Sequence, residues 1–200
     1  MVEYLSDIKV TLRPATIEDA DLIGPRLRQS DAAELLAASG LSAADSLRFS
    51  IKASQGGFCM IAINDDGEPI LIWGVAPSSN DGVGIPWMVA TNEIYRAQYL
   101  LTFKKLCGEW VRKMNERFPL LINYVDHRNV TSILWLQALG FVFTKLVPNY
   151  GHGKLPFWEF MRVKENVWTH YCRYDDGKPL NLRNNGERDA QYHAGCLCRV

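Results

Sequence analysis

The chain has 200 residues, 48% of them hydrophobic and 22% charged, and its 22 Lys and Arg balance its 22 Asp and Glu. This composition is typical of a soluble globular domain and excludes global disorder, which requires low hydrophobicity and a high net charge. A net charge of zero argues against a broad electrostatic attraction to nucleic acid or to anionic lipid.

The first fifty residues predict one strand followed by two helices. Residues 8–13 alternate between apolar and polar side chains, which is the period of a half-buried strand. A Ser or Thr followed three residues later by Asp caps a helix, and this pattern predicts helices over residues 17–38 and 43–53. The first of these helices contains Gly24 and Pro25, so a break at that point is left open.

The middle of the chain predicts a hairpin, a strand and a long helix. Two apolar runs, residues 58–63 and 69–75, flank an Asp-Asp-Gly turn and predict a β-hairpin. Residues 85–90 predict a further strand. A long helix is predicted over residues 93–117, because its apolar residues recur at intervals of three and four.

The last predicted elements complete a mixed domain. Residues 120–125 are almost uniformly apolar, as in a strand that is buried on both faces. A short helix is predicted over residues 131–139, and two more strands over 141–147 and 157–163. Strands that are mixed with packed helices in this order indicate a single α/β or α+β domain.

The composition changes near residue 164, so we expect a domain over residues 1–164 and a tail or small annex over 165–200. The tail combines turn-forming residues with soft metal ligands: His170, Cys172, His193, Cys196 and Cys198. Their spacing matches no standard zinc finger, and we therefore expect no metal site. A packing tail or a tail that binds a partner is favoured instead, with aromatic residues as anchors. The remaining cysteines, Cys59 and Cys107, are expected to be buried thiols.

One segment of the chain resembles a known family. It begins at Asn129 and ends at Gly140-Phe141, and it is similar to the GNAT N-acetyltransferase segment in which an Asn opens a helix and Gly-Phe closes it. The opening Arg-Pro-Ala-Thr, residues 13–16, also resembles that family. The resemblance covers residues 8–163. It implies a GNAT-like α/β domain with a central mixed sheet of about seven strands, flanked by about four helices.

A narrower resemblance covers residues 123–129 and 135–141 together. These segments look like a GNAT-like group that is encoded by short-tailed, autographivirus-type phages. Members of that group are described as internal virion or virion-assembly proteins, and some as acetyltransferases. The resemblance implies other phage virion proteins as partners and the cytoplasm of an infected host, or the virion, as location. It leaves open whether the chain also forms homo-oligomers.

The cofactor loop of the GNAT family is degenerate in this sequence. Acetylating members carry a Gln/Arg-x-x-Gly-x-Gly/Ala loop at the start of the long helix, whose amides hold the acetyl-CoA pyrophosphate. When Arg96 is placed at the first position of this motif, Tyr99 and Leu101 stand where the small residues belong. We expect these bulky side chains to obstruct the loop.

The family's general acid is also absent. Many GNAT enzymes use a Tyr in the helix after the Asn, and Leu136 occupies that position here, beside Trp135. The polar residues that remain are Asp126, His127 and Asn129, which follow a predicted buried strand. Asp126 and His127 could together act as a base. The alternative is a polar loop whose Asp and Asn cap the next helix.

These observations leave two main hypotheses. The first is a noncatalytic, virion-associated assembly protein without a cofactor; a host-directed inhibitor with the same fold cannot be distinguished from it by sequence. The second is an acetyl-CoA-dependent N-acetyltransferase that acts on a primary amine. In that case Asp126, His127 and Asn129 would be catalytic, and acetyl-CoA would contact the residues Met88, Ala90, Arg96 and Asn129.

The sequence also bears on location. No stretch approaches the 18 apolar residues that a membrane-spanning helix needs, and the first residues carry acids where a secretion signal carries bases. We therefore expect neither a membrane partner nor secretion.

Overall fold

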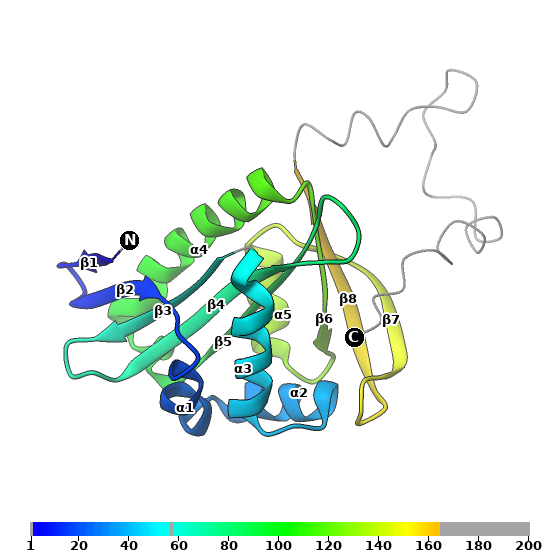
Figure 1. The fold of residues 1–200 in the computed structure, drawn as a ribbon, viewed down its shortest axis with the longest axis horizontal. Coiled ribbons are helices and arrows are strands. Elements are labelled where there is room, and N and C mark those ends of the chain that lie inside the picture. The colour runs from blue at the N-terminus through cyan, green and yellow to red at the C-terminus, as the bar shows by residue number, and fades with distance from the viewer. Residues whose placement is uncertain (1, 57, 165–200) are drawn as a thin grey trace, which may run out of the picture.

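One mixed sheet of eight strands organises the protein in the computed structural model, which describes residues 2–56 and 58–164 (Figure 1). The strand order is β1-β2-β3-β4-β5-β6-β8-β7. Every neighbouring pair is antiparallel except β5 and β6, which are parallel. The strands are β1 (Glu3–Leu5), β2 (Val10–Pro14), β3 (Phe58–Asn64), β4 (Pro69–Pro77), β5 (Val83–Ala90), β6 (Leu120–Asp126), β7 (Val142–Tyr150) and β8 (Leu155–Val163).

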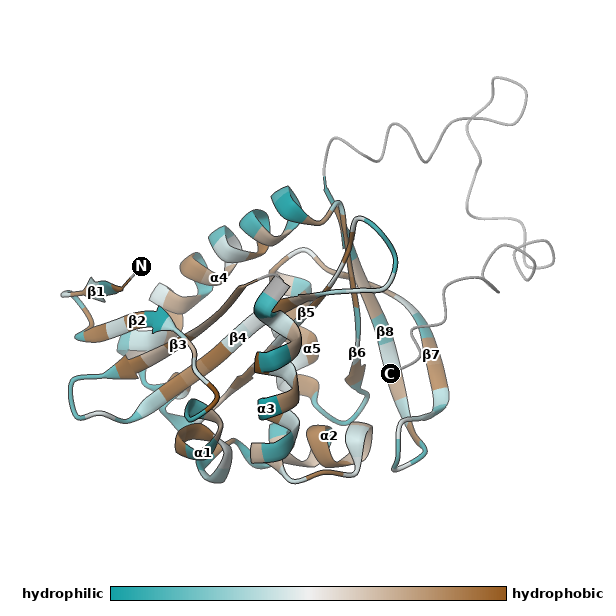
Figure 2. Ribbon diagram, viewed as in Figure 1, coloured by the Kyte–Doolittle hydropathy of each residue, from teal (hydrophilic) through white to brown (hydrophobic). Residues whose placement is uncertain are grey.

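Helices cover both faces of the sheet (Figure 1). A small apolar core joins α1 and α3 to one face, and a larger core joins α4 to the other. Figure 2 shows the same division, with hydrophobic strands between helices whose outer faces are hydrophilic. The α-helices are α1 (Asp19–Ile23), α2 (Gln29–Ser39), α3 (Ala43–Ala53), α4 (Ala97–Arg117) and α5 (Val130–Ala138). The mixed α/β fold expected from the sequence is thus confirmed.

Three local predictions differ from the structure. The sequence did not predict β1, a strand of three residues at the sheet edge. The helix expected over residues 17–38 is divided into α1, a 3₁₀ turn at Gly24–Arg26 and α2, because Pro25 has no N–H to continue a helix. The long helix begins at Ala97 rather than at residue 93, since Asn92–Tyr95 forms a separate 3₁₀ turn.

The end of α5 agrees with the motif that closes it. Gly140 adopts a left-handed conformation with φ of 80°, and the Phe141 N–H donates back to the Leu136 carbonyl. Glycine has no Cβ and adopts this conformation without strain. The expected Gly-Phe exit from the helix is therefore present.

The parallel strands β5 and β6 separate soon after they begin. They pair only at Val83 with Leu120 and at Gly84 with Leu121. Elsewhere β5 is paired with β4, and β6 with β8. A Cβ on Gly84 would lie 2.7 Å from the Phe118 ring, so this close approach requires glycine. Beyond it the two strands diverge, and a crevice at the carboxyl ends of strands commonly holds a ligand.

The turn between β7 and β8 holds the C-terminal end of α2. The His152 and Gly153 N–H groups donate to the carbonyls of Ala38 and Ala37, at 3.0 and 2.8 Å. These bonds satisfy carbonyls that a helix end otherwise leaves without partners. The turn therefore fixes α2 beside the divergent strands.

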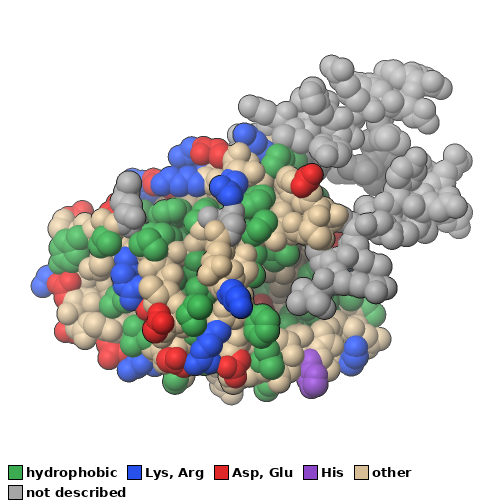
Figure 3. All heavy atoms as spheres, in the orientation of Figure 1, with side chains coloured by type: hydrophobic (Ala, Val, Ile, Leu, Met, Phe, Trp, Pro, Cys, Tyr) green, Lys and Arg blue, Asp and Glu red, His purple; other side chains and the backbone are tan. Residues whose placement is uncertain are grey.

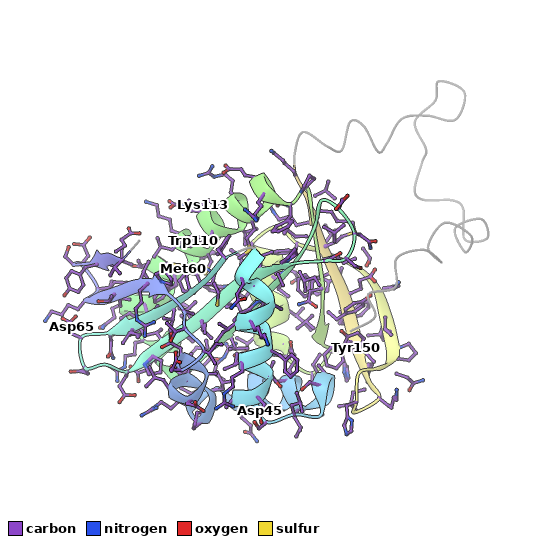
Figure 4. The ribbon with its side chains drawn as sticks, viewed as in Figure 1. Asp45, Met60, Asp65, Trp110, Lys113 and Tyr150 are labelled. Carbon is purple, nitrogen blue, oxygen red and sulfur yellow. The ribbon has the colours of Figure 1, made fainter. Side chains whose placement is uncertain are left out.

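The opposite face is held by aromatic packing. Trp110 on α4 lies against Phe58 and Trp73, with ring centroids 5.3 and 5.8 Å away (Figure 4). The Lys113 ammonium lies 4.4 Å from the centroid of the Trp110 ring, a cation–π contact. These contacts fix α4 against β3 and β4. Within the described residues, no helix is long and apolar enough to cross a membrane.

Candidate functional site in the crevice between β5 and β6

The free edge of β5 is occupied at its end by the chain itself. The Ala90 N–H donates to a carboxylate oxygen of Asp31 at 2.9 Å, and the Ala90 carbonyl accepts from the Arg28 N–H at 2.9 Å. Leu27 and Thr91 form an antiparallel bridge next to these bonds. The start of α2 and the residues before it therefore cap the edge of β5 that faces the crevice.

The capping carboxylate belongs to a buried ion pair. The Arg28 guanidinium donates to both Asp31 oxygens, with Nε–Oδ2 at 3.0 Å and Nη2–Oδ1 at 2.8 Å. The two side chains are only 7% and 2% exposed. Burial by itself lowers the pKa of Arg28, but the contacts with Asp31 and Tyr95 outweigh it and raise that pKa. Such a fork holds Asp31 in one orientation.

Asn129 connects this ion pair to α5. Its side-chain amide donates to Asp31 at 3.2 Å and to Glu34 at 2.8 Å. Its carbonyl oxygen accepts from the Ser132 N–H at 3.4 Å and caps the first turn of α5. Asn129 is buried. One side chain thus joins two helices that are about a hundred residues apart in sequence.

Glu34 is the most perturbed acid of the crevice. Burial raises its pKa to about 8, and the nearby Asp31 and Asp126 also raise it, against the hydrogen bond from Asn129. Glu34 also lines the main cavity of the crevice. A titratable group that is shifted by burial and lines a cavity is a candidate for a functional role.

The main cavity passes between β5 and β6 and has a volume of about 210 Å³. Figure 3 shows the surface hollowed on the β6 side of α3. Tyr150 on β7 (Figure 4) stacks on Tyr124, with ring centroids 4.5 Å apart. The walls are largely aromatic and include Trp73, Trp87, Trp110, Trp135, Tyr124 and Tyr150. A small apolar molecule or group is what such a cavity suits best.

The space beside the first turn of α4 is nearly filled. A second cavity of about 40 Å³ lies between the end of β5 and the first turns of α4 and α5. Tyr95, Leu100 and Trp135 line it, together with Arg28. A water molecule needs about 10–15 Å³ of such space, so this cavity takes only a few waters and is much smaller than the main cavity.

The predicted base residues lie close together, with the His127 Nδ1 3.6 Å from an Asp126 carboxylate oxygen, but each also has another partner. The Arg128 guanidinium donates to both Asp126 oxygens, and the Arg128 N–H donates to one of them at 2.9 Å. Burial raises the pKa of Asp126, but these bonds outweigh it and hold that pKa below its ordinary value. His127 is half-exposed, and its Nδ1 lies 3.2 Å from the Pro156 carbonyl. Asp126 is therefore arranged as an ion-pair partner.

The predicted cofactor loop lies at the first turn of α4, where its motif placed it. Arg96 directly precedes α4, and its exposed guanidinium pairs with Glu93 at 3.0 Å. Tyr99 is buried against Phe103 and does not project into a loop. Leu101 is 77% exposed on the outside of α4. Tyr99 and Leu101 therefore occupy opposite environments on α4, and the expected obstruction of a cofactor by these side chains stays a prediction.

The structure brings together some of the predicted residues and adds others. Asn129 and Ala90 meet through Asp31, while Met88 lines the adjacent crevice. The sequence reasoning missed the residues Arg28, Asp31 and Glu34. Their spacing of three residues, from Arg28 directly before α2, places them on one helical face. A charged helical face next to the end of a buried strand was the sequence signal that could have identified them.

The pKa of Glu34 predicts a dependence of stability on pH. Between its ordinary value near 4.5 and about 8, the folded protein holds a proton at Glu34 that the unfolded chain releases. The free energy of unfolding should therefore fall as pH rises through this window, by at most about 1.4 kcal/mol per pH unit. Glu34→Gln should remove this decline and preserve the acceptor for Asn129.

Urea denaturation from pH 5 to 9 measures this difference. The acids with lowered pKa values contribute stability that is lost below this window, as pH falls through their pKa values; they are Glu18, Asp19, Asp45, Asp126 and Glu159. They act equally in both proteins. Equal slopes for the wild type and Glu34→Gln would contradict a raised pKa at Glu34.

The described residues contain no group of three or more His, Cys, Asp or Glu side chains arranged to hold a metal ion. The candidate ligands between His170 and Cys198 lie outside the described residues. Cys107 is buried and Cys59 partly buried, and neither forms a disulfide within the described part. Burial raises the pKa of each of these thiols to about 12, so both are protonated at neutral pH.

Comparison with known families gives one match. Residues 60–147 match the family described as "Bacteriophage T7, probable scaffold protein Gp13". This segment runs from β3 to β7 and includes both strands of the crevice. No curated protein matches the chain.

Solved structures with similar folds are GNAT acetyltransferases. A ribosomal-protein-S5-alanine acetyltransferase from Vibrio fischeri covers 90% of this chain and 100% of its own, with a TM-score of 0.57 and 13% identity. A GNAT phosphinothricin acetyltransferase from Sinorhizobium meliloti, solved with AcCoA, covers 78% and 88%, with a TM-score of 0.56 and 23% identity. A GNAT-family acetyltransferase from Bacillus anthracis covers 81% and 97%, with a TM-score of 0.58 and 8% identity. The chain therefore has the GNAT fold.

Proposed function

We propose that this chain, a GNAT-fold protein whose central segment matches a phage scaffold family, is a noncatalytic assembly protein of a phage. It acts by binding other phage virion proteins in the cytoplasm of the infected host, and it enters the assembling particle with them. Acetyl-CoA is not its cofactor. The family match supports an assembly role, and the crevice supports the loss of acetyl transfer.

The Ala90 amide is the observation that carries this proposal. In acetylating GNAT proteins, the resemblance implies that amides of the strand equivalent to β5 polarise the thioester carbonyl. Here the Ala90 N–H is bonded to Asp31, and Asp31 is itself held by Arg28 and Asn129. Before a thioester oxygen could use the Ala90 N–H, this buried network would have to break. The network is therefore better suited to holding β5, α2 and α5 together.

Two further features support the same conclusion. The cavity at the first turn of α4 is small, about 40 Å³, with Tyr95 and Leu100 among its walls. Leu136 occupies the position of the general acid, and Leu136 and Trp135 both line the main cavity. Neither side chain can return a proton to a departing thiolate.

Quantitative mass spectrometry of particles tests the assembly role. Infection with phage that encodes the protein should yield purified proheads or virions that contain it at a fixed ratio to a capsid protein. An abundant host cytoplasmic protein measured in the same preparations controls for contamination. A protein that is abundant in the infected lysate but absent from both kinds of particle would contradict the proposal and favour a host-directed role.

Glu34 favours a second candidate function, an acetyl-CoA-dependent N-acetyltransferase that acts on a primary amine. A carboxyl group with a pKa of about 8 that lines an aromatic cavity is suited to accept a proton from an amine. The Met88 N–H supports this candidate, because amides alternate along a strand and that of Met88 faces the same side as that of Ala90.

Acetyl transfer to a panel of primary amines distinguishes the two functions. The assembly proposal predicts no transfer above the uncatalysed rate for the wild type. Transfer that Glu34→Gln abolishes, and that rises with pH toward 8, would support the enzyme and contradict the noncatalytic proposal.

A further inference from the structure

A shallow basic groove lies on the outer side of α4, away from the crevice. It is formed by α4, the end of α5 and one residue of β8, and it has a volume of about 590 Å³. Three of its residues are basic and none is acidic. The groove residues are Leu101, Lys104, Lys105, Gly108, Ala138, Leu139, Gly140 and Arg162.

No contact within the described residues requires glycine at position 108. It lies in the interior of α4, where glycine costs about 1 kcal/mol relative to alanine. A Cβ at this position would meet no atom within 4 Å. The missing side chain therefore serves no packing within the described residues. It leaves the helix backbone open at the floor of the groove, where another backbone can approach closely.

The rims of the groove are apolar and exposed. Leu101 on α4 is 77% exposed. The helix α5 carries no charged residue, and none of its nine residues is buried. Beyond the groove itself, Val130 and Leu134 of this helix are 59% and 60% exposed. Helices that bury no residue and expose their apolar side chains are typical of interaction surfaces.

We propose that this groove binds an acidic amphipathic helix of another protein. The apolar residues of that helix would contact Leu101 and Leu139, and its backbone would pass over Gly108. Its acidic side chains would lie against Lys104, Lys105 and Arg162, which is the charge complementarity that favours this occupant. The proposal rests on the proposed assembly function, because it names the kind of segment that a virion partner would present.

Peptide binding tests the groove directly. The probe is a helical peptide of about 16 residues that carries Leu on one face and Glu on its flanks, and its matched control carries Lys in place of Glu. Fluorescence anisotropy should show saturable binding of the Glu peptide only. Lys104→Glu combined with Lys105→Glu should weaken it at least about tenfold, whereas Lys52→Glu on α3 should not.

Substitutions at Gly108 distinguish peptide binding in the groove from a general attraction to positive charge. Gly108→Ala should raise the free energy of unfolding by about 1 kcal/mol, because the added methyl group meets open space in the free protein, and it should weaken peptide binding, because the methyl group stands where the peptide backbone approaches. Gly108→Trp should fold normally by circular dichroism and lose binding at least about tenfold. Equal binding by the wild-type protein and Gly108→Trp would overturn the proposal.

Other occupants give distinct results. Displacement of the peptide by millimolar CoA would indicate an anion site and overturn the proposal. A concentration-dependent dimer that Gly108→Trp dissociates in sedimentation velocity would assign the groove to a second copy and also overturn it. Wild-type protein that enters particles while Gly108→Trp does not would support both the groove and the assembly function. Peptide binding with no wild-type protein in particles would support the groove and contradict only the assembly function.

Discussion

Asp31→Ala should lower the free energy of unfolding by about 3–5 kcal/mol, which is a large part of the stability of a domain of this size. The substitution leaves the Arg28 guanidinium buried without its carboxylate. It also removes the acceptor of the Ala90 N–H and one acceptor of the Asn129 amide. Urea denaturation at pH 7, monitored by tryptophan fluorescence, measures the change.

Two controls separate the buried network from a general loss of charge. Asp21→Ala on α1 removes a carboxylate that is 63% exposed and pairs with Arg48, and it should cost less than about 1 kcal/mol. Combining Arg28→Met with Asp31→Leu removes both charges and should recover part of the loss. If Asp31→Ala costs no more than Asp21→Ala, the network does not hold β5 to α2.

Gly151→Ala should cost about 2–4 kcal/mol, because two effects add. Gly151 has φ of 63°, a conformation that strains any residue with a Cβ. The added Cβ would also lie 2.6 Å from the Ala38 carbonyl oxygen and 2.7 Å from its Cα. Backbone atoms cannot rotate away, so the turn would have to leave α2 and lose its two hydrogen bonds. Thermal and urea unfolding both report this loss.

Gly67→Ala is the matched control for this prediction. Gly67 also has a positive φ, of 80°, but a Cβ there would meet nothing within 4 Å. Its substitution should cost only the conformational strain, about 1 kcal/mol. Equal costs for the two substitutions would show that the turn between β7 and β8 does not hold α2.

The sheet and its main helices could be predicted from the sequence because their signals are local. The alternation in β2, the Asp-Asp-Gly turn between β3 and β4, and the helical period of α4 each lie within one element. The break between α1 and α2 has a local signal at Pro25, but packing also fixes it, and the start of α4 follows a 3₁₀ turn that no pattern indicated. Gly24 fits against Ala44, where a Cβ would lie 3.0 Å from backbone atoms, and no short window of sequence contains that contact.

The site could be predicted only in part, because its contacts are long-range. Asn129 was identified from a motif, and its role as a helix cap follows from residues next to it. Its bonds to Asp31 and Glu34 join residues 98 and 95 positions apart. The raised pKa of Glu34 depends on burial that only the assembled fold provides. The GNAT fold could be recognised from the sequence, whereas the hydrogen bonds that occupy the Ala90 backbone at the end of β5 could not.

We propose that the chain itself occupies the end of β5 at Ala90 and that the protein does not bind acetyl-CoA, and thermal unfolding with acetyl-CoA tests this most directly. A ligand at about 100 times its Kd stabilises a protein by about 2.7 kcal/mol, which raises the Tm of a domain of this size by roughly 5–10 °C. The account predicts a shift below about 1 °C for the wild type at millimolar acetyl-CoA, with free CoA as the control. A cooperative, concentration-dependent rise of several degrees would contradict it.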